Sequence, residues 1–420
     1  MKIKFHSQSF MVCLMIISIL VVISIVITSC CPPFCSPVPD PSPRKELRRV
    51  PHDQEIFGDN SNVQIVSGIW HIDKAIVIGN KKISGTYSTT WKPIVWISSD
   101  GINWERIWEG NRGYMKKIIS LGYDDNNNYR GLIAVGGTTP GRNGRHIIWE
   151  SENGENWVEQ VQLSHHGVIN DIIYIGSDDI FLAVGNHEEA ATAWTSNDGI
   201  NWNEIEDDPR NLGVRSSENR ANQYMMNAVA KNSDGYVAVG VNFYGWGVYE
   251  HIPTFWYSDD GLQWTRTEDN SELQPWARIW LTSVNPPSGN YSTSEMIAIG
   301  VADTDGGKKI MVYKSSDRQN WALLNQDDDL IGARLNAFRL WSGPSIGVGS
   351  LGYNACIWTF SPYEFDWSIS NILELGNTKK AAICDMFYMP GKRNGFVYVG
   401  WAIENDGSPK VGAIWRYGAW

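Results

Sequence analysis

"WISSDGINW", residues Trp96 to Trp104, decides the fold, because altered copies of it recur along the chain. The related turns read "SSDGINW", "SENGENW", "SNDGINW", "SDDGLQW" and "SSDRQNW". Ser is always first, Asp or Asn third and Trp seventh, and Gly is usually fourth. A short polar side chain that accepts backbone N–H groups, followed by a Gly with positive φ, is typical of a tight turn between strands. The pattern therefore predicts one hairpin that is built many times.

The turn residues are assigned to structure and not to catalysis. They are Ser98, Asp100, Trp104, Ser151, Asn153, Trp157, Ser196, Asp198, Trp202, Ser258, Asp260, Trp264, Ser315, Asp317 and Trp321. Asn153 stands where the other copies have Asp, and a turn tolerates this exchange whereas a general acid or a nucleophile does not. Catalysis also needs one or two carboxylates with shifted pKa values, and not one in every repeat. No catalytic residue is evident in the sequence.

A second series consists of short apolar runs that end in glycine, such as "LIAVG" and "FLAVG". The glycines are Gly79, Gly136, Gly185, Gly240, Gly300, Gly349 and Gly400. Each is followed by another run that ends in an aromatic residue: Trp96, Trp149, Trp194, Trp256, Tyr313, Trp358 and Trp415. A third run precedes each glycine run, as in "INDIIYIG". Each unit thus offers about four short strands, too few to bury both faces alone, so like units must stack.

Seven such units predict an all-β fold: a seven-bladed β-propeller of four-stranded antiparallel blades over residues 53–420. The last copy, "AIWRYGAW", has no outermost strand, and the first is preceded by surplus sequence that includes "DQEIF", Asp53 to Phe57. We expect an N-terminal strand to complete the last blade and close the ring, which removes an exposed sheet edge.

Composition narrows the classes of function. The chain of 420 residues has 21 Trp and 40 Gly and a formal net charge of -11. An acidic domain repels phosphate backbones, so we expect no nucleic-acid partner. No Cys/His spacing indicates a zinc site, and no other metal or cofactor is indicated.

The N-terminal residues predict export. Lys2 and Lys4 precede "FMVCLMIISILVVISIVI", an uncharged apolar segment, and residues 1–29 are predicted to be a signal peptide or a membrane anchor. The following "ITSC" resembles a bacterial lipobox, in which Cys30 takes the lipid. A lipoprotein, an uncleaved anchor helix and plain secretion remain open. Residues 30–52 are rich in proline and predict a semi-rigid stalk. We expect the domain in the cell envelope, tethered to a membrane and facing away from the cytoplasm.

Only two cysteines, Cys356 and Cys384, belong to the predicted domain. A disulfide between them is possible in an oxidising compartment, but two separate buried thiols are favoured.

The turns resemble Asp-box repeats, also called BNR repeats, whose pattern is Ser-x-Asp-x-Gly-x-Thr-Trp. Here Gly directly follows Asp and the Thr is absent. The resemblance implies a sialidase-like propeller in which these turns lie at the periphery. Sialidases of that family also carry an Arg-Ile-Pro motif, an arginine triad and a Tyr/Glu pair. The similar tripeptide Arg49-Val50-Pro51 lies in the predicted stalk, and no arginine triad is evident, so sialidase chemistry is not carried over.

Ligand binding is expected on the face opposite the turns, in the loops after the glycine runs. Aromatic and charged residues gather there in "GVNFYGWGVYEHIPT", "GRNGRH" and "GNHEEAAT". The candidate binding residues are Tyr244, Trp246, Tyr249, His251, Arg142, Arg145, His187 and Glu188. The sequence is interpreted as a platform that binds a protein or a glycan without transforming it. The alternative is a sialidase-like glycoside hydrolase or lyase with a divergent active site, which should place two carboxylates, or a Tyr/Glu pair, across the axial pocket.

Overall fold

In the computed structural model the chain divides into two units, Met1–Arg44 and Lys45–Trp420. The structure describes residues 46–418 of the second unit except 52, 59–61, 85–88, 124–128, 141–143, 162–165, 176–179, 206–207, 209, 214–221, 245–249, 268–277, 287–293, 305–306, 326–331, 340–344, 362–365, 373–378, 391–394 and 406. The expected signal or anchor, Cys30 and most of the expected stalk lie outside the described residues. Within the described part, no helix is long and apolar enough to cross a bilayer.

The described residues form antiparallel sheets in which strands that follow each other in sequence are paired. The first sheet holds β2 (Asn62–His71), β3 (Lys74–Ser84), β4 (Thr89–Ser98) and β5 (Glu105–Glu109). The second holds β6 (Tyr114–Ser120), β7 (Leu132–Gly137), β8 (His146–Ser151) and β9 (Val158–Val161). The third holds β10 (Gly167–Ile175), β11 (Ile180–His187), β12 (Ala190–Ser196) and β13 (Asn203–Glu204).

An eight-stranded sheet follows. It holds β14 (Asn222–Asn232), β15 (Gly235–Tyr244), β16 (Glu250–Ser258), β17 (Thr265–Arg266), β18 (Arg278–Asn285), β19 (Met296–Thr304), β20 (Gly307–Ser315) and β21 (Ala322–Asn325). The next sheet holds β22 (Ala333–Arg339), β23 (Ser345–Leu351), β24 (Asn354–Ser361) and β25 (Asp366–Ile372). The last sheet holds β26 (Lys380–Met389), β27 (Gly395–Ile403), β28 (Val411–Gly418) and β1 (Glu46–Arg49).

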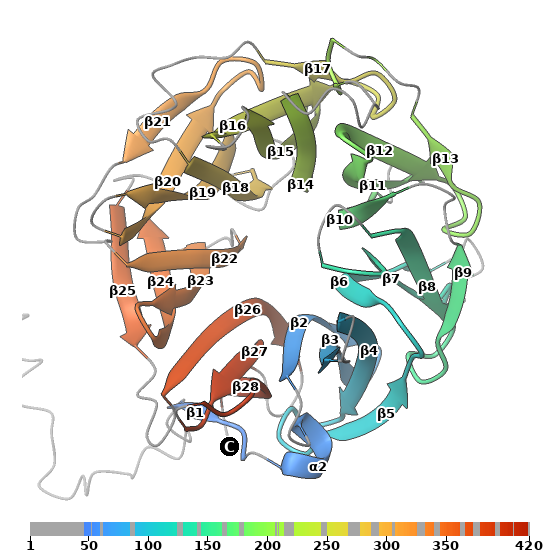
Figure 1. Ribbon diagram of the computed structural model, residues 1–420, viewed down its shortest axis with the longest axis vertical. Coiled ribbons are helices and arrows are strands. Elements are labelled where there is room, and N and C mark those ends of the chain that lie inside the picture. The colour runs from blue at the N-terminus through green and yellow to red at the C-terminus, as the bar shows by residue number, and fades with distance from the viewer. Residues whose placement is uncertain are drawn as a thin grey trace, which may run out of the picture. The chain divides into compact units, whose positions relative to one another are not determined.

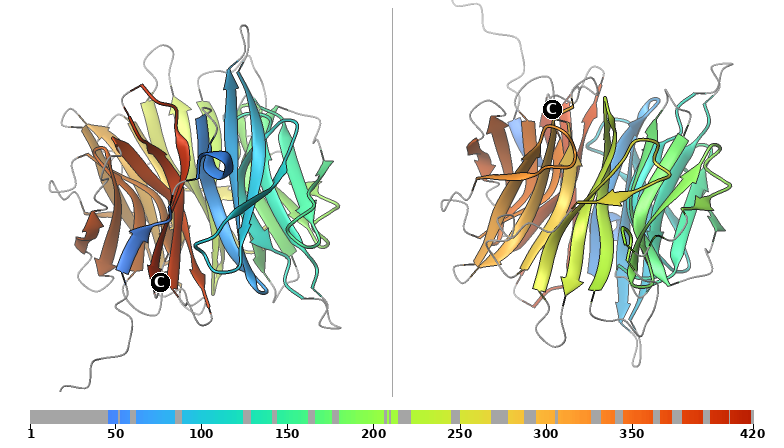
Figure 2. Two further views of the ribbon diagram at one scale, coloured as in Figure 1. Left: turned by 90° about the horizontal axis from the view of Figure 1, so that it is seen from below. Right: turned by 90° about the horizontal axis from the view of Figure 1, so that it is seen from above.

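Within the unit Lys45–Trp420 the sheets stand side by side around a central axis, in a propeller-like arrangement (Figure 1). The strands nearest the axis are β2, β6, β10, β14, β18, β22 and β26, and the strands run from one face of the ring to the other (Figure 2). The expectation of an all-β fold made of four-stranded antiparallel units is confirmed.

One sheet differs from the expected separate blades. Its two four-stranded halves are joined by a single parallel bridge between His251 of β16 and Arg278 of β18. The bridge lies at the start of both strands and adds one pair to an otherwise repeated pattern. Hydrogen bonding alone therefore counts six sheets in the described residues instead of seven.

The last sheet is completed from the N-terminal side of the chain, by a different segment from the one that we named. Glu46–Arg49 forms β1 and pairs antiparallel with β28, whereas "DQEIF" contains the short helix α2 (Gln54–Phe57). Asp53 accepts the backbone N–H of Glu55 and Ile56, which caps this helix. The strand thus comes from the segment expected to be a stalk, because β28 offered a free edge that even "ELRR" can pair with.

The core lies between neighbouring sheets. The aromatic residue that ends each third strand is at most 3% exposed in all seven copies, which confirms that part of the repeat. One hydrophobic cluster joins Ile65 and Trp96 of the first sheet to Val397 and Ile414 of the last. Stacking of like units therefore supplies the second buried face of each sheet, and truncating one such aromatic to Ala costs about 3–5 kcal/mol. Cys356 and Cys384 are both free thiols.

Candidate functional site

The glycine series marks a bulge in every innermost strand. In β10, for example, the pairing with β11 shifts register between Ile169 and Asp171, opposite Gly185, so Asn170 becomes an extra residue. A Cβ atom at Gly185 would lie 1.9 Å from the carbonyl oxygen of Val168, so only glycine allows this close approach. The same shift occurs in all seven innermost strands, and the extra residues are Val66, Lys116, Asn170, Asn227, Thr282, Asn336 and Cys384.

All seven extra residues line one cavity on the axis, with a volume of about 530 Å³. From each bulge, the lining continues toward the carboxyl end of the strand, as in Lys116–Ser120 and Asn170–Tyr174. This volume lies within the range of small-molecule sites, roughly 300–1,000 Å³. The axial cavity is the candidate functional site.

Amide side chains at the bulges join neighbouring innermost strands around the cavity. Asn170 donates to the carbonyl of Met226 at 2.8 Å, and Asn227 donates to the carbonyl of Leu281 at 2.8 Å. Asn336 repeats the contact, 2.7 Å from the carbonyl oxygen of Ile383. Because each amide bonds to the next innermost strand, the wall of the cavity is held by fixed polar contacts.

One buried carboxylate in the cavity gathers groups from three sheets. Asp385 Oδ2 accepts a hydrogen bond from Ser67 Oγ at 2.7 Å and lies 3.2 Å from Lys117 Nζ. Its Oδ1 accepts the backbone N–H of Met386 at 2.9 Å. These donors stabilise the ionised form of a side chain that is only 2% exposed.

A second carboxylate in the cavity has a different setting. Asp171 accepts the backbone N–H groups of Ile172 and of Val229, both at 3.0 Å. Burial raises the pKa of Asp171, Lys117 and these hydrogen bonds oppose the rise, and the charge of Asp385 adds to it. The cavity therefore holds two carboxylates that interact electrostatically: Asp385, whose charge is stabilised by donors, and Asp171, whose pKa is raised by burial.

Lys116 lines the same cavity, next to Lys117 on β6. The protein around it disfavours the charged form, and burial lowers its pKa to about 8. A lysine with this pKa is partly neutral near pH 8 and can take up a proton. Across the described residues, no group of three or more His, Cys, Asp or Glu side chains is arranged to hold a metal ion.

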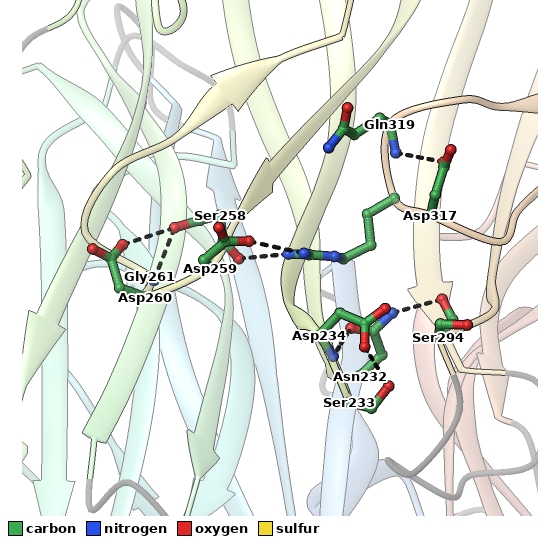
Figure 3. Close-up of polar contacts among 11 residues, drawn as sticks. Asn232, Ser233, Asp234, Ser258, Asp259, Asp260, Gly261, Ser294, Asp317 and Gln319 are labelled. Atoms are coloured by element: carbon green, nitrogen blue, oxygen red, sulfur yellow. Dashed lines mark hydrogen bonds and ion pairs between the residues drawn. The ribbon is translucent and has the colours of Figure 1, made fainter.

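The repeated turns have hydrogen bonds of the kind that a structural interpretation requires. Asp198 Oδ1 accepts the backbone N–H of Ile200 and Asn201, while Ser196 Oγ accepts that of Gly199. Burial alone would raise the pKa of Asp198, but the hydrogen bonds from Asn201, Ile200 and Ser196 lower it well below its usual range. The turn residues do not line the axial cavity. Figure 3 shows two of these turns, with Gly261 against Ser258 and Gln319 against Asp317.

Among the predicted binding residues, His187, Glu188 and Arg145 lie together at the amino end of β10. Gly167, the first residue of β10, pairs with His187, and the neighbouring His166 forms a bridge with Arg145 and accepts the backbone N–H of Glu188. His187 is buried, with Nδ1 2.5 Å from Glu204 Oε1. These residues lie on the other side of the bulge from the cavity, so they do not line it.

The remaining candidates are divided between packing and undescribed positions. The ring of His251 packs against Trp280 and Phe243, at centroid distances of 4.4 and 4.9 Å. Arg142, Trp246 and Tyr249, and the side chain of Tyr244, lie outside the described residues. Arg49, in the tripeptide Arg49-Val50-Pro51, belongs to β1 and forms an ion pair with Glu404 at 2.6 Å.

Comparisons with known proteins identify solved structures of similar fold but match no protein family. No protein-family model matches the chain, and no curated protein is similar to it. One solved structure, a polysaccharide lyase described as an ulvan lyase of family PL25, is 10% identical, covers 84% of this chain and 91% of its own, and has a TM-score of 0.50. A second polysaccharide lyase is 6% identical with coverages of 84% and 89% and a TM-score of 0.48.

A structure from the GH130 family, described as containing glycoside hydrolases that target β-1,2-mannosidic linkages in Candida mannan, is 13% identical. It covers 63% of this chain and 83% of its own, with a TM-score of 0.34. At such identities the likeness concerns the fold alone.

One of these structures corrects the expected function. We interpreted the sequence as a binding platform without catalysis, and this interpretation was wrong: the solved structure with a TM-score of 0.50 is described as a polysaccharide lyase. That description agrees better with the alternative, a divergent glycoside hydrolase or lyase. The Asp-box family itself is matched by no family model, so that resemblance remains an interpretation of the turns.

Proposed function

We propose that this chain cleaves glycans in its axial cavity, as a glycoside hydrolase or a polysaccharide lyase. The observation that carries the proposal is the pair Asp171 and Asp385, which line one cavity in opposite electrostatic settings. Two carboxylates whose environments favour different protonation states are what acid–base cleavage of a glycosidic bond requires. The similarity in fold to a polysaccharide lyase supports the same class of reaction.

The groups in the cavity divide the proton transfers between them. Asp171, whose pKa is raised, gives a proton to the oxygen of the leaving sugar. In a hydrolase, Asp385 acts on the opposite side, as the base that activates water or as the nucleophile. In a lyase, Lys116 in its neutral form removes a carbon-bound proton of the sugar, because burial lowers its pKa to about 8.

The scaffold of this site is, in our proposal, a seven-bladed propeller closed by β1. The eight-stranded sheet counts as two blades, since within the described residues a single bridge, between His251 and Arg278, pairs its halves. The pairing of β1 with β28 and the cluster shared by the first and last sheets support closure. For the N-terminal segment we keep the proposal of export and a membrane tether through Cys30 or an anchor helix, on the sequence alone.

The test is to incubate the purified full-length chain with a panel of neutral and acidic polysaccharides. A hydrolase raises the number of reducing ends only, whereas a lyase also produces the ultraviolet absorbance of an unsaturated sugar. Asp171→Asn and Asp385→Asn should each lower the release that the native chain shows about 100-fold or more. No release from any polysaccharide by the native chain, or release by either variant equal to that of the native chain, would contradict the proposal.

A further inference from the structure

A second pocket lies at the amino end of β2, on the other side of the bulge from the axial cavity. It encloses about 160 Å³ and is lined by Asn62, Val63, Gln64, Lys82, Trp91 and Lys410. Among the described residues, no carboxylate lines it. This lysine pocket lies in a chain whose formal net charge is -11, so its positive charge is a local feature.

The two lysines of this pocket are held in place by the backbone. Lys82 pairs with Asn62 across β2 and β3. The backbone N–H of Lys410 donates to Asn62 Oδ1 at 2.9 Å, and the carbonyl of Lys410 accepts the N–H of Val63 at 2.8 Å. Strand pairing of Lys82 and the hydrogen bonds of Lys410 thus bring together two cations that are far apart in the sequence.

Among the described residues, aromatic rings and not carboxylates contact the two ammonium groups, and Lys410 Nζ lies over the ring of Trp401, 4.0 Å from its centroid. In the described part of the chain, no carboxylate forms an ion pair with Lys82 or with Lys410, whereas Lys92, next to Trp91, lies 3.2 Å from Glu109. Burial lowers the pKa of Lys410, Cys384 opposes this, and the charges of Arg334 and Lys82 add to the lowering. Repulsion between the cations is relieved when an anion binds.

Aromatic side chains complete the pocket. Lys82 lies over the ring of Trp91, with Nζ 5.9 Å from the centroid, and Trp91 packs edge-on against Tyr114 at 5.0 Å. The Tyr114 hydroxyl accepts a hydrogen bond from Gln64. A rigid, partly exposed indole beside a cationic pair offers a flat face for a sugar ring and charges for an acidic substituent.

We propose that the lysine pocket is a subsite for an acidic sugar, which Lys82 and Lys410 bind through a carboxylate or sulfate group while its ring lies on Trp91. The inference rests on the proposed function and narrows its substrates to acidic glycans. It adds a binding site outside the axial cavity, at the opposite end of β2.

The test measures binding of three matched oligosaccharides to the full-length chain by calorimetry: one neutral, one built of hexuronic acid and one sulfated. At least one acidic oligosaccharide should bind about 10-fold or more tightly than the neutral one, as one charge-assisted contact of about 1.4 kcal/mol predicts. Whether the hexuronic acid or the sulfated oligosaccharide binds more tightly shows whether the pocket prefers a carboxylate or a sulfate group. Equal binding of all three would overturn the proposal, as would equally tight binding of inorganic sulfate alone.

The variants test the residues. The double variant Lys82→Gln/Lys410→Gln should lose the preference for the acidic sugar, about 10-fold in affinity, whereas Lys92→Gln, whose partner is Glu109, should change it less than about 2-fold. Equal effects of the two changes would overturn the assignment. Cleavage is recorded in parallel: binding of acidic sugars without turnover retains this subsite and rejects the catalytic proposal, and turnover without a charge preference does the reverse.

Discussion

The repeated turns and the repeated bulges differ in what stays constant from copy to copy. The turns are nearly uniform in sequence, because each side chain in them satisfies the same backbone groups. At the bulges the backbone is uniform and the extra residue varies from Val66 to Lys116 to Cys384. In a repeat protein, uniform side chains therefore indicate architecture, and a varied side chain on a constant backbone indicates a site.

The glycine opposite each bulge should give the largest effect on stability. In Gly185→Ala the new Cβ would meet the carbonyl oxygen of Val168 at 1.9 Å, so we expect a loss of about 3–4 kcal/mol in the free energy of unfolding. Gly352→Ala is the matched control, because its site is open and only its φ of 58° is strained, which costs about 1–2 kcal/mol. Urea denaturation compares the two. Equal losses would mean that the close approach is not what requires glycine.

Replacing a carboxylate in the cavity and replacing one in a turn should affect catalytic activity differently. We expect Asp171→Asn to lower kcat on a cleaved polysaccharide about 100-fold or more, because a general acid is lost. Asp198→Asn, in a turn, should leave kcat within about 2-fold, since it does not line the cavity. Thermal melting shows whether Asp171→Asn is folded despite its altered contact with Val229. If the turn variant loses as much activity as the cavity variant, the division between the two repeats is wrong.

The turn acids should contribute to stability in a defined pH range. Burial would raise the pKa of Asp317, but hydrogen bonds from Asn320, Gln319 and Ser315 outweigh it and lower the pKa from 3.8 to about 2. Because the folded pKa lies below the unfolded value, this contribution is fully present above pH 3.8 and is lost as the pH falls through about 2. The melting temperatures of the native chain and of Asp317→Asn should therefore converge as the pH falls over this range.

A reciprocal change sharpens the same prediction. Asn153 is the uncharged member of the series and accepts the backbone N–H of Glu155 and Asn156 in the same way. Asn153→Asp should gain stability at neutral pH and lose that gain in acid. If the gain were unchanged at low pH, charge would not be its source.

Replacing Arg318 by Gly in the fifth turn should have the smallest effect on the free energy of unfolding. Arg318 stands where four turns have Gly, with a φ of 67°, and its guanidinium reaches Ser258 O and Asp259 Oδ1 of the neighbouring turn. Arg318→Gly relieves strain and loses these contacts, so we expect a change within about 1 kcal/mol. Arg318→Ala loses the contacts and keeps the strain, and should cost about 1–2 kcal/mol more. Equal stability of the two variants would show that backbone strain at this position does not matter.

Much of the fold could be predicted from the residues, because strand periodicity, turn chemistry and buried aromatics are local signals. The strand that completes the last sheet was assigned to the wrong segment, since "ELRR" has no apolar alternation and pairs only because β28 has a free edge. The site was missed for a different reason. A bulge shifts the register by one residue, which turns Asn170 toward the axis, and the glycine opposite the bulge was interpreted only as part of a repeat.

A signal for the site was nevertheless present. "INDIIYIG", "MNAVAK" and "LNAFRL" each place Asn directly after an apolar residue, three copies in one register, and this amide proved to be the extra residue of the bulge. Polar residues repeated at a position between buried ones can therefore be read as facing an axis. The pairing of Asp171 with Asp385 could not be read this way, because they come from sheets far apart in the sequence and meet only across the cavity.

The pairing of β1 with β28 also constrains the order in which the chain folds during synthesis. A ribosome makes Glu46–Arg49 long before Val411–Gly418, so this strand has no partner until Val411–Gly418 has emerged. The β1–β28 ladder therefore forms last and joins segments that are far apart in the sequence. Such long-range pairing makes the last step of folding slow and cooperative. A chain cut short at its carboxyl side would leave two unsatisfied edges at once, and such fragments are the ones that aggregate.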